Sequence, residues 1–151
     1  MGRRASRETA MKLLYQMEIQ KSDKSEQIEM ALEDESFTEK DKKYIRNIID
    51  GVNEKVTIID SIIEKNSMGW KINRVSKIDL SILRIGIYEI LYREDIPFSV
   101  SVNEAVELAK KYSNDDAGSF VNGLLAKVTK ADSKAEIALE VQANEENVSL
   151  E

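Results

Sequence analysis

Apolar residues recur every three or four positions along most of this 151-residue chain, and that spacing confines it to helical folds. The clearest run begins at Ile45 and ends at Ile63, with eight apolar side chains on one helical face. No stretch alternates long enough to indicate a strand, and only one proline interrupts the pattern. We therefore expect an all-α fold, a compact bundle of about six to seven helices.

The run from Ile45 to Ile63 predicts the longest and most central helix, ending near Asn66. Thr38 and Asp41 fit a capping box, in which a hydroxyl is followed three residues later by an acid. Gly51 lies inside this helix, where glycine costs up to ~1 kcal/mol relative to alanine. We interpret it as a point where another helix approaches closely.

The remaining apolar stripes predict further helices on both sides of this one. They cover residues 6–20, 25–34, 74–93 and 118–130, with another helix starting at a second capping box formed by Ser101 and Glu104. Residues 114–118 are interpreted as a turn before the last helix. Each large aliphatic side chain that becomes fully buried contributes about 1.5–3 kcal/mol, so mutual burial of the stripes would stabilise the bundle.

Composition argues against several function classes. Cysteine and histidine are both absent, which removes sulfur-based zinc sites, a thiol nucleophile and the usual general base near neutral pH. No phosphate-binding glycine loop occurs, so no cofactor is expected. No apolar run approaches the ~18 residues of a membrane span, and no signal peptide follows the first arginines. We expect a cytoplasmic protein that is not an enzyme.

The net charge of −6 is unevenly distributed. Residues 131–151 carry a net charge of −5, so the other 130 residues sum to −1, and the first twelve carry +3. Local patches decide where a phosphate chain binds, so an acidic protein can still bind RNA. We interpret residues 1–130 as one helical RNA-binding domain and residues 131–151 as an acidic, disordered C-terminal tail.

Two features point to a single nucleic-acid strand. Arg3, Arg4 and Arg7 form a basic start whose guanidinium groups match phosphates, although a solvated, disordered start is the simpler interpretation. Phe120 is expected near a helix N-terminus, where its ring could stack on an unpaired base or simply fill the core. Asn122 could read a base edge or cap a turn, which leaves both roles open.

Other candidates carry equally plain structural alternatives. Lys110, next to Lys111, could contact phosphates or simply face solvent. Arg84 interrupts an apolar run, and Asp79 or Glu89 is its expected ion-pair partner if its role is structural. The remaining aromatic candidates, Tyr15 and Trp70, could line an interface for a protein partner or fill the core.

Three segments together resemble the NusB family of bacterial transcription antitermination factors. They are Leu83-Arg84-Ile85-Gly86-Ile87-Tyr88-Glu89, the run from Pro97 to Lys110 that contains Asn103-Glu104-Ala105, and Phe120-Val121-Asn122-Gly123. The arginine-rich start and Ala10-Met11-Lys12-Leu13-Leu14-Tyr15 also fit, and the resemblance covers about residues 3–130.

The resemblance implies two packed three-helix bundles without catalytic activity. Family members bind the boxA segment of nascent RNA together with the small-subunit ribosomal protein that acts as Nus factor E. This complex helps RNA polymerase read through terminators, notably in ribosomal RNA operons, and some members form homodimers. The acidic tail lies outside the family pattern, and the basic start is interrupted by Ala5 and Ser6.

The same resemblance assigns site residues in this chain. The protein-partner surface would include Tyr15 and Asp79. The RNA surface would comprise Arg3, Arg4, Arg7, Arg84, Lys110, Asp116, Phe120 and Asn122. We expect the basic start and the beginning of the last helix to form one cradle for the RNA strand.

Two other functions compete with antitermination. Ribosomal RNA cytosine methyltransferases carry a similar helical domain, but no cofactor-binding α/β unit occurs within these 151 residues. A protein–protein adaptor would use Tyr15, Asp79 and Trp70 and leave the arginines incidental. Binding to short A/U-rich RNA, with and without the ribosomal partner, distinguishes the adaptor from the RNA-binding protein.

Overall fold

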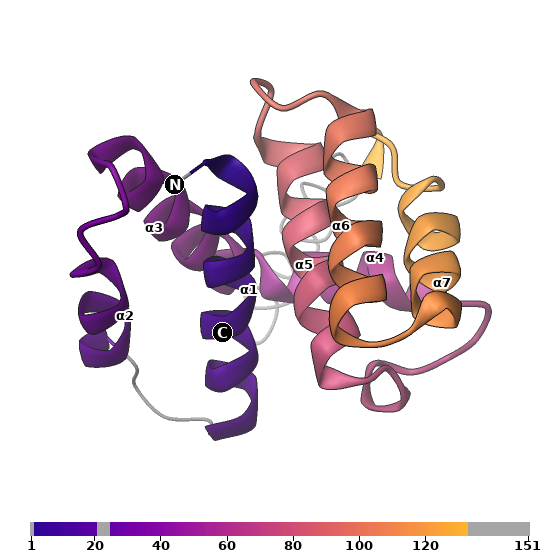
Figure 1. Cartoon of the computed structure of the whole chain (residues 1–151). Helices are drawn as coiled ribbons and strands as arrows, with labels where there is room; N and C mark the ends of the chain where they lie inside the picture. The colour runs from indigo at the N-terminus through magenta and orange to yellow at the C-terminus, as the bar shows by residue number, and fades with distance from the viewer. Residues whose placement is uncertain (1, 21–24, 133–151) are drawn as a thin grey trace, which may run out of the picture.

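The computed structural model describes residues 2–20 and 25–132, and every regular element in these ranges is helical. The expected all-α fold is confirmed (Figure 1). The helices are α1 (Arg3–Gln20), α2 (Ser25–Leu32), α3 (Glu39–Glu54), α4 (Val56–Asn66), the 3-10 turn η1 (Ile72–Arg74), α5 (Lys77–Tyr92), α6 (Phe98–Tyr112) and α7 (Asp115–Leu125).

The helices form two groups that meet at α5. One group contains α1, α2 and α3, and the other contains α5, α6 and α7, with α4 behind them in the view of Figure 1. α1 packs on both α3 and α5, while α6 packs between α5 and α7. The two groups correspond to the two three-helix bundles that the resemblance implies, with α4 as an addition.

α5 is the central helix. All of its residues from Asp79 to Leu91 are buried, because it contacts α1, α3, α4, α6 and α7. The expectation that the central helix would lie between Ile45 and Ile63 is therefore wrong. α5 carries apolar residues on nearly every face, as expected for a helix surrounded by others.

The run from Ile45 to Ile63 is also two helices rather than one. α3 ends at Glu54 and α4 starts at Val56, with a break at Lys55. The apolar spacing continues through this break because both helices bury their stripes against α5. Periodicity reports which residues are buried, and it cannot reveal a bend that keeps the same face inward.

The helix boundaries show where local signals succeed. Thr38 and Asp41 form the expected capping box, with each side chain accepting a hydrogen bond from the other residue's backbone N–H. The predicted capping box of Ser101 and Glu104 is wrong, because α6 already starts at Phe98. The Ser101 hydroxyl instead donates a hydrogen bond to Glu89.

α7 also differs from its predicted range of 118–130. It starts at Asp115, with Asn114 as the N-cap whose side chain accepts from the Ala117 N–H, and it ends at Leu125. The residues interpreted as a turn therefore form the cap and first turn of this helix. Phe120 consequently lies in the second turn of α7 rather than in the first turn, as its predicted range implied.

The acidic tail lies almost entirely outside the described residues. Its described start includes Asp132, which is 7% exposed, accepts from the Thr129 N–H and pairs with Lys65 at 3.3 Å. None of the helices in residues 2–20 and 25–132 combines the length and apolarity that crossing a bilayer requires.

Gly51 lies where α3 meets α5, and the ring of Tyr88 occupies the space that a side chain would need. An added Cβ would lie 2.2 Å from the Tyr88 ring. We expect Gly51→Ala to lower the free energy of unfolding by about 1–3 kcal/mol, because the overpacking exceeds the gain in helix propensity.

Gly123 provides the matched control for this substitution. Nothing lies within 4 Å of a Cβ added there, so Gly123→Ala is expected to stabilise α7 by up to ~1 kcal/mol. Urea unfolding followed by circular dichroism measures both variants. Equal shifts in the same direction would contradict the close approach at Gly51.

Candidate nucleic-acid interface

The basic start forms the first turns of α1 and lies against α6. Arg4 donates two hydrogen bonds to Glu104 of α6, at 2.9 and 2.8 Å, although its side chain is 73% exposed. Arg3 is partly exposed, and its guanidinium lies 4.3 Å from the centre of the Tyr44 ring. Both guanidinium groups are therefore held by the fold while remaining close to solvent.

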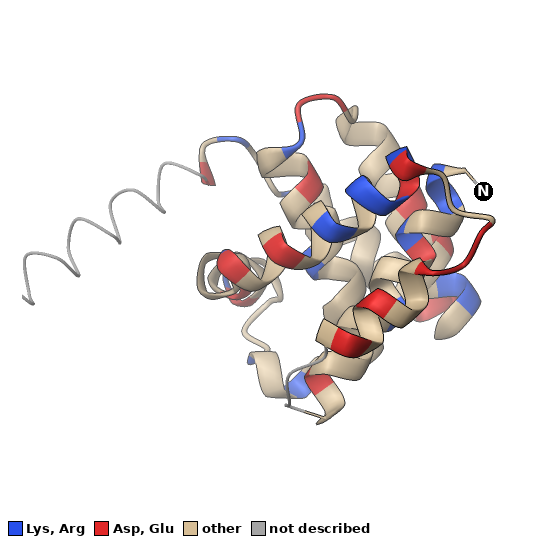
Figure 2. Ribbon diagram, turned by 90° about the vertical axis from the view of Figure 1, so that its left-hand side faces the viewer, with Lys and Arg blue, Asp and Glu red and all other residues tan. Residues whose placement is uncertain are grey.

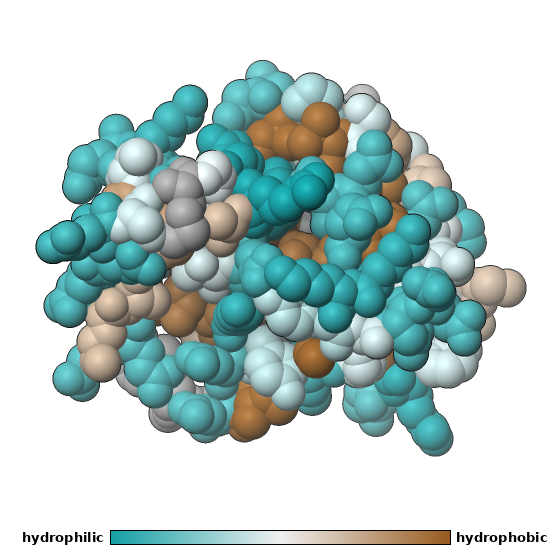
Figure 3. Space-filling view, viewed as in Figure 1, coloured by the Kyte–Doolittle hydropathy of each residue, from teal (hydrophilic) through white to brown (hydrophobic). Residues whose placement is uncertain are grey.

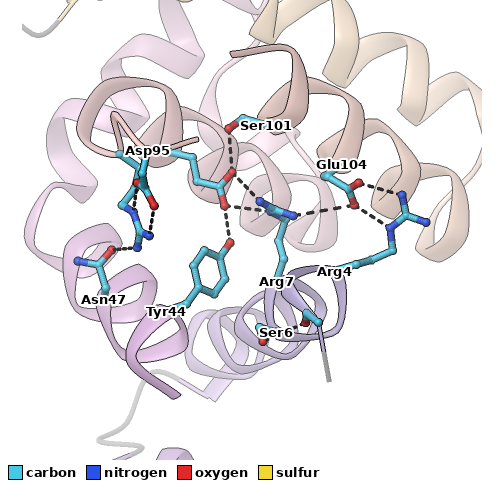
Figure 4. Close-up of polar contacts among 11 residues, drawn as sticks. Arg4, Ser6, Arg7, Tyr44, Asn47, Asp95, Ser101 and Glu104 are labelled. Carbon is cyan, nitrogen blue, oxygen red and sulfur yellow. Dashed lines mark hydrogen bonds and ion pairs between the residues drawn. The ribbon is translucent and has the colours of Figure 1, made fainter. Parts of the chain in front are cut away.

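Arg7 is in a different position, because it is buried within the molecule. It donates to both carboxylate oxygens of Glu89, at 2.9 and 3.2 Å, and is only 3% exposed. Tyr44 and Ser101 donate to the same carboxylate from α3 and α6 (Figure 4). The structure thus places Arg7 inside the junction between the two helix groups, where it also lies 3.9 Å from Glu104, the carboxylate that binds the exposed Arg4.

Burial and the neighbouring Glu89 charge raise the pKa of the Tyr44 phenol far above its ordinary value. The phenol therefore stays protonated across the accessible pH range and donates a hydrogen bond to Glu89. Burial works against the charged form of Arg7, but electrostatic attraction to the Tyr44 oxygen and to the Glu89 carboxylate outweighs it and raises the pKa of Arg7. The network is complete, since each buried charge has an oppositely charged or hydrogen-bonding partner.

Arg84 is also buried and paired. It donates to Asp60 of α4 at 2.9 and 2.8 Å and to Glu18 of α1 at 2.9 Å. The prediction that Asp79 or Glu89 would pair with Arg84 is wrong, because α1 and α4 pack beside Arg84 and supply the carboxylates. These bonds leave little of Arg84, which is 8% exposed, for an RNA phosphate.

The other RNA candidates gather where α6 meets α7. Lys110 is exposed and its stem packs on Gly118, where an added Cβ would lie 2.9 Å from its Cγ. Asp116 and Asn122 are exposed on α7. Phe120 is partly exposed and packs against the core, so it contributes to core packing while its stacking on a base stays a prediction.

The expected single cradle is divided by α6. In Figure 1, α1 and α7 lie on opposite sides of the α5–α6 pair. Residues of α6 bridge the gap, with Glu104 bound to Arg4 and Lys111 bound to Glu8 of α1 at 3.1 Å. A strand that contacts both ends must therefore cross the exposed face of α6. Most of the face seen in Figure 3 is hydrophilic.

The two protein-partner candidates lie at the same end of the molecule. α1 runs antiparallel to α5, since Arg7 pairs with Glu89 and Glu18 pairs with Lys77. Tyr15 is therefore on the part of α1 that lies beside the start of α5, where Asp79 is found. Tyr15 is half-buried and Asp79 is 9% exposed.

A cavity of about 650 Å³ lies between residues 66–76 and α7. It is lined by Asp79, Asp116 and Phe120 together, so the structure joins residues that the resemblance divides between two partners. Trp70 and Met68 also line it, and both are strongly exposed, at 59% and 88%. The sequence does not reveal the exposure of Trp70 or Met68, because a loop has no periodicity from which to judge it.

Comparison with known proteins identifies the family. The family model described as "NusB family" matches residues 4–130. The chain belongs to the NusB family. It is 74% identical to a protein of Ruminiclostridium cellulolyticum named transcription antitermination protein NusB, over 96% of this chain and 97% of that protein. A protein of the same name from Acetivibrio thermocellus is 57% identical over 86% of this chain and 90% of that protein.

Solved structures agree with this assignment. NusB of T. maritima superposes with a TM-score of 0.79 and 37% identity, covering 86% of this chain and 92% of that one. A second structure contains antitermination factors NusB and NusE in complex with dsRNA. Its matching chain has a TM-score of 0.75 and 30% identity, over 85% of this chain and 96% of that one.

The buried position of Arg7 predicts a large effect on stability. We expect Arg7→Ala to lower the free energy of unfolding by about 3–5 kcal/mol, because Glu89 loses its cation inside the protein. Urea unfolding measures the change. The control is Arg46→Ala, which removes an arginine paired with Glu29 on the exposed surface, and its urea midpoint should scarcely move. Equal midpoints for the two variants would show that Arg7 does not stabilise the junction.

Proposed function

We propose that this chain is a transcription antitermination factor that binds boxA-type single-stranded RNA together with the small-subunit ribosomal protein acting as Nus factor E. The observation that carries the proposal is its similarity, over most of both chains, to a chain of the solved complex of antitermination factors NusB and NusE with dsRNA. The relatives named transcription antitermination protein NusB support the same role. On this proposal the chain binds without catalysing a reaction and acts in the cytoplasm, on the transcription elongation complex.

The side chains divide by their exposure into two roles. Arg3, Arg4 and Lys110 are accessible enough to contact phosphates from α1 and α6. Arg7 and Arg84 act instead as positioning residues, because each is saturated by carboxylates of neighbouring helices. Arg7 holds the turn of α1 that presents Arg3 and Arg4, so it supports RNA binding without touching the strand.

α7 supplies the contacts to bases. The exposed part of the Phe120 ring can stack on an unpaired base, and stacking of this kind contributes about 1–3 kcal/mol per base. Asn122 can donate to and accept from a base edge. Asp116 can accept a hydrogen bond from a base amino group or a ribose 2′-hydroxyl. Recognition of unpaired bases by stacking and edge contacts is typical of single-stranded RNA binding.

Phe120→Ala tests the stacking contact. We expect it to weaken binding of a boxA RNA oligonucleotide roughly 5- to 150-fold, which corresponds to about 1–3 kcal/mol. Fluorescence anisotropy in the presence of saturating Nus factor E measures the affinity. Phe98→Ala is the matched control, since Phe98 is 46% exposed at the start of α6, and it should leave the affinity unchanged. If RNA does not bind the wild-type chain even with the ribosomal protein, the adaptor function is favoured instead.

Arg4 tests the phosphate contacts through salt dependence. Each phosphate contact to a single strand contributes a slope of about −0.7 to the plot of log affinity against log salt. We expect Arg4→Ala to make this slope shallower by about 0.7. Glu104→Gln should strengthen binding at low salt, because it removes the carboxylate that competes with phosphate for Arg4. Unchanged slopes in both variants would remove Arg4 from the RNA surface.

A further inference from the structure

Lys12 of α1 and Lys111 of α6 form a lysine pair that converges on a single carboxylate. Glu8 lies 3.5 Å from the Lys12 ammonium nitrogen and accepts hydrogen bonds from Lys111 at 3.2 and 3.1 Å. The two nitrogens lie close together, because both are within 3.5 Å of the same oxygen, Glu8 Oε1. Two positive charges thus share one negative charge, which leaves one positive charge in excess.

Tyr112 of α6 holds these three charged groups in place. Its hydroxyl donates to Glu8, and its ring centre lies 5.5 Å from the Lys12 nitrogen and 5.3 Å from the Lys111 nitrogen. The ring itself packs on the core. The hydrogen bond from Tyr112, together with those from Lys111, lowers the pKa of Glu8, so this carboxylate stays charged at neutral pH and keeps both lysines near it.

Both ammonium groups remain accessible to a ligand. The side chains of Lys12 and Lys111 are 56% and 60% exposed, whereas that of Glu8 is 21% exposed. Each ammonium group carries three donors, and Glu8 occupies only part of them. A ligand with several acceptor oxygens can therefore share the lysine pair with Glu8.

The lysine pair lies between the two ends of the proposed RNA surface. α1 and α6 run in the same direction, since Arg4 pairs with Glu104 and Glu8 pairs with Lys111 further along both helices. Lys110, the residue before Lys111, instead packs its stem on α7. Consecutive lysines of α6 thus face α1 and α7, on the route that a strand must take between these two helices (Figure 1).

We propose that the lysine pair binds one phosphate group of the RNA strand where the strand crosses α6. Charge-assisted N–H···O bonds to a phosphate are about 2.7–2.9 Å long, and its separate oxygens allow it to bind both ammonium groups at once. The inference rests on the proposed function, since the phosphate belongs to the boxA-type strand. The family resemblance places neither Lys12 nor Lys111 on the RNA surface, so this contact is an addition made by this chain.

A carboxylate of the protein partner is the competing occupant, because it also brings acceptor oxygens and negative charge. The position of the lysine pair favours the strand. Glu104 and Glu107 of α6 both act on Arg4, so a phosphate chain that leaves Arg4 along α6 passes two carboxylates. The excess positive charge of the lysine pair offsets this repulsion at the point where the strand turns toward Lys110 and α7.

Salt dependence tests this contact in the full-length chain. The double substitution Lys12→Gln and Lys111→Gln is compared with wild type by fluorescence anisotropy, using a boxA RNA oligonucleotide and saturating Nus factor E. Since one phosphate contact contributes about −0.7 to the plot of log affinity against log salt, the slope should become shallower by about 0.7, with about fivefold weaker binding at about 0.1 M salt. An unchanged slope overturns the proposal. A change of about 1.4 also overturns it, because the lysines would then bind two separate phosphates.

The matched control removes the same charge elsewhere. Lys40 and Lys43 are exposed on α3, and their joint replacement by glutamine should leave the slope unchanged. Equal changes in the two double variants would attribute the effect to net charge and overturn the site. Circular dichroism checks the fold, and the thermal midpoint of the lysine-pair variant should stay close to that of wild type, because exposed ion pairs contribute little to stability.

Neutral phosphates test the same contact from the RNA side. Each phosphate of the oligonucleotide is replaced in turn by an uncharged methylphosphonate. At one position the replacement should weaken binding to the wild-type chain by about the factor seen with the lysine-pair variant, and it should cause no further loss in that variant. If no position behaves in this way, the lysine pair does not bind a phosphate of the strand.

The outcomes separate this inference from the proposed function. Normal RNA binding by the lysine-pair variant overturns only the phosphate contact. If this variant binds Nus factor E more weakly in the absence of RNA, the occupant is a carboxylate of the protein partner and the proposal is wrong. Failure of the wild-type chain to bind RNA with the ribosomal protein overturns the proposed function and this inference with it.

Discussion

The Glu89 carboxylate is the interaction on which the arrangement of the helices depends. It is fully buried in α5 and accepts hydrogen bonds from Arg7 of α1, Tyr44 of α3 and Ser101 of α6. A buried carboxylate without these donors would be strongly unfavourable, so the three surrounding helices must be in place together. Glu89 thereby couples the two helix groups by polar contacts in addition to their apolar packing.

This coupling prepares the surface that we propose for RNA. Because Arg7 is fixed inside, the turn of α1 that precedes it is ordered, and Arg3 and Arg4 already have defined positions against Tyr44 and Glu104. A flexible basic arm would lose conformational entropy on binding, whereas this helix has lost it during folding. The same geometry places α1 and α7 on opposite sides of the α5–α6 pair, so a strand that contacted both helices would have to span that pair.

Local sequence signals predicted the existence of most helices and misplaced several of their ends. Apolar spacing identifies α1, α3, α5 and α7 because each buries a continuous stripe, and that burial dominates folding. Ser101 and Glu104 have the spacing of a capping box, yet both side chains bind residues far away in the sequence. Ser101 binds Glu89, and Glu104 binds Arg4. Such contacts join residues far apart in the chain, and no local pattern contains them.

In the candidate site, too, the sequence indicates suitable residue types but not their positions in the fold. Residue types suggested which side chains suit RNA, but only the fold distinguishes the exposed Arg4 from the buried Arg7 three residues later. Both share a helix with similar local composition. The cavity around Asp79 was equally inaccessible to sequence reasoning, because Trp70, Asp79 and Phe120 come from a loop and two separate helices. The resemblance named Asp79 and Phe120 individually without indicating that they face one space.

Acidic and basic residues alternate over the helices in Figure 2, and this mixing has a consequence for selectivity. Arg4 is bound to Glu104, and Lys111 is bound to Glu8, so a phosphate must compete with an internal carboxylate for each. Non-specific binding depends mainly on phosphate contacts, so the competition at Arg4 and Lys111 weakens it. Stacking on Phe120 and edge contacts to Asn122 are unaffected by that competition. On the proposed function, a chain with a net charge of −6 would bind arbitrary RNA weakly while keeping the interactions that recognise unpaired bases.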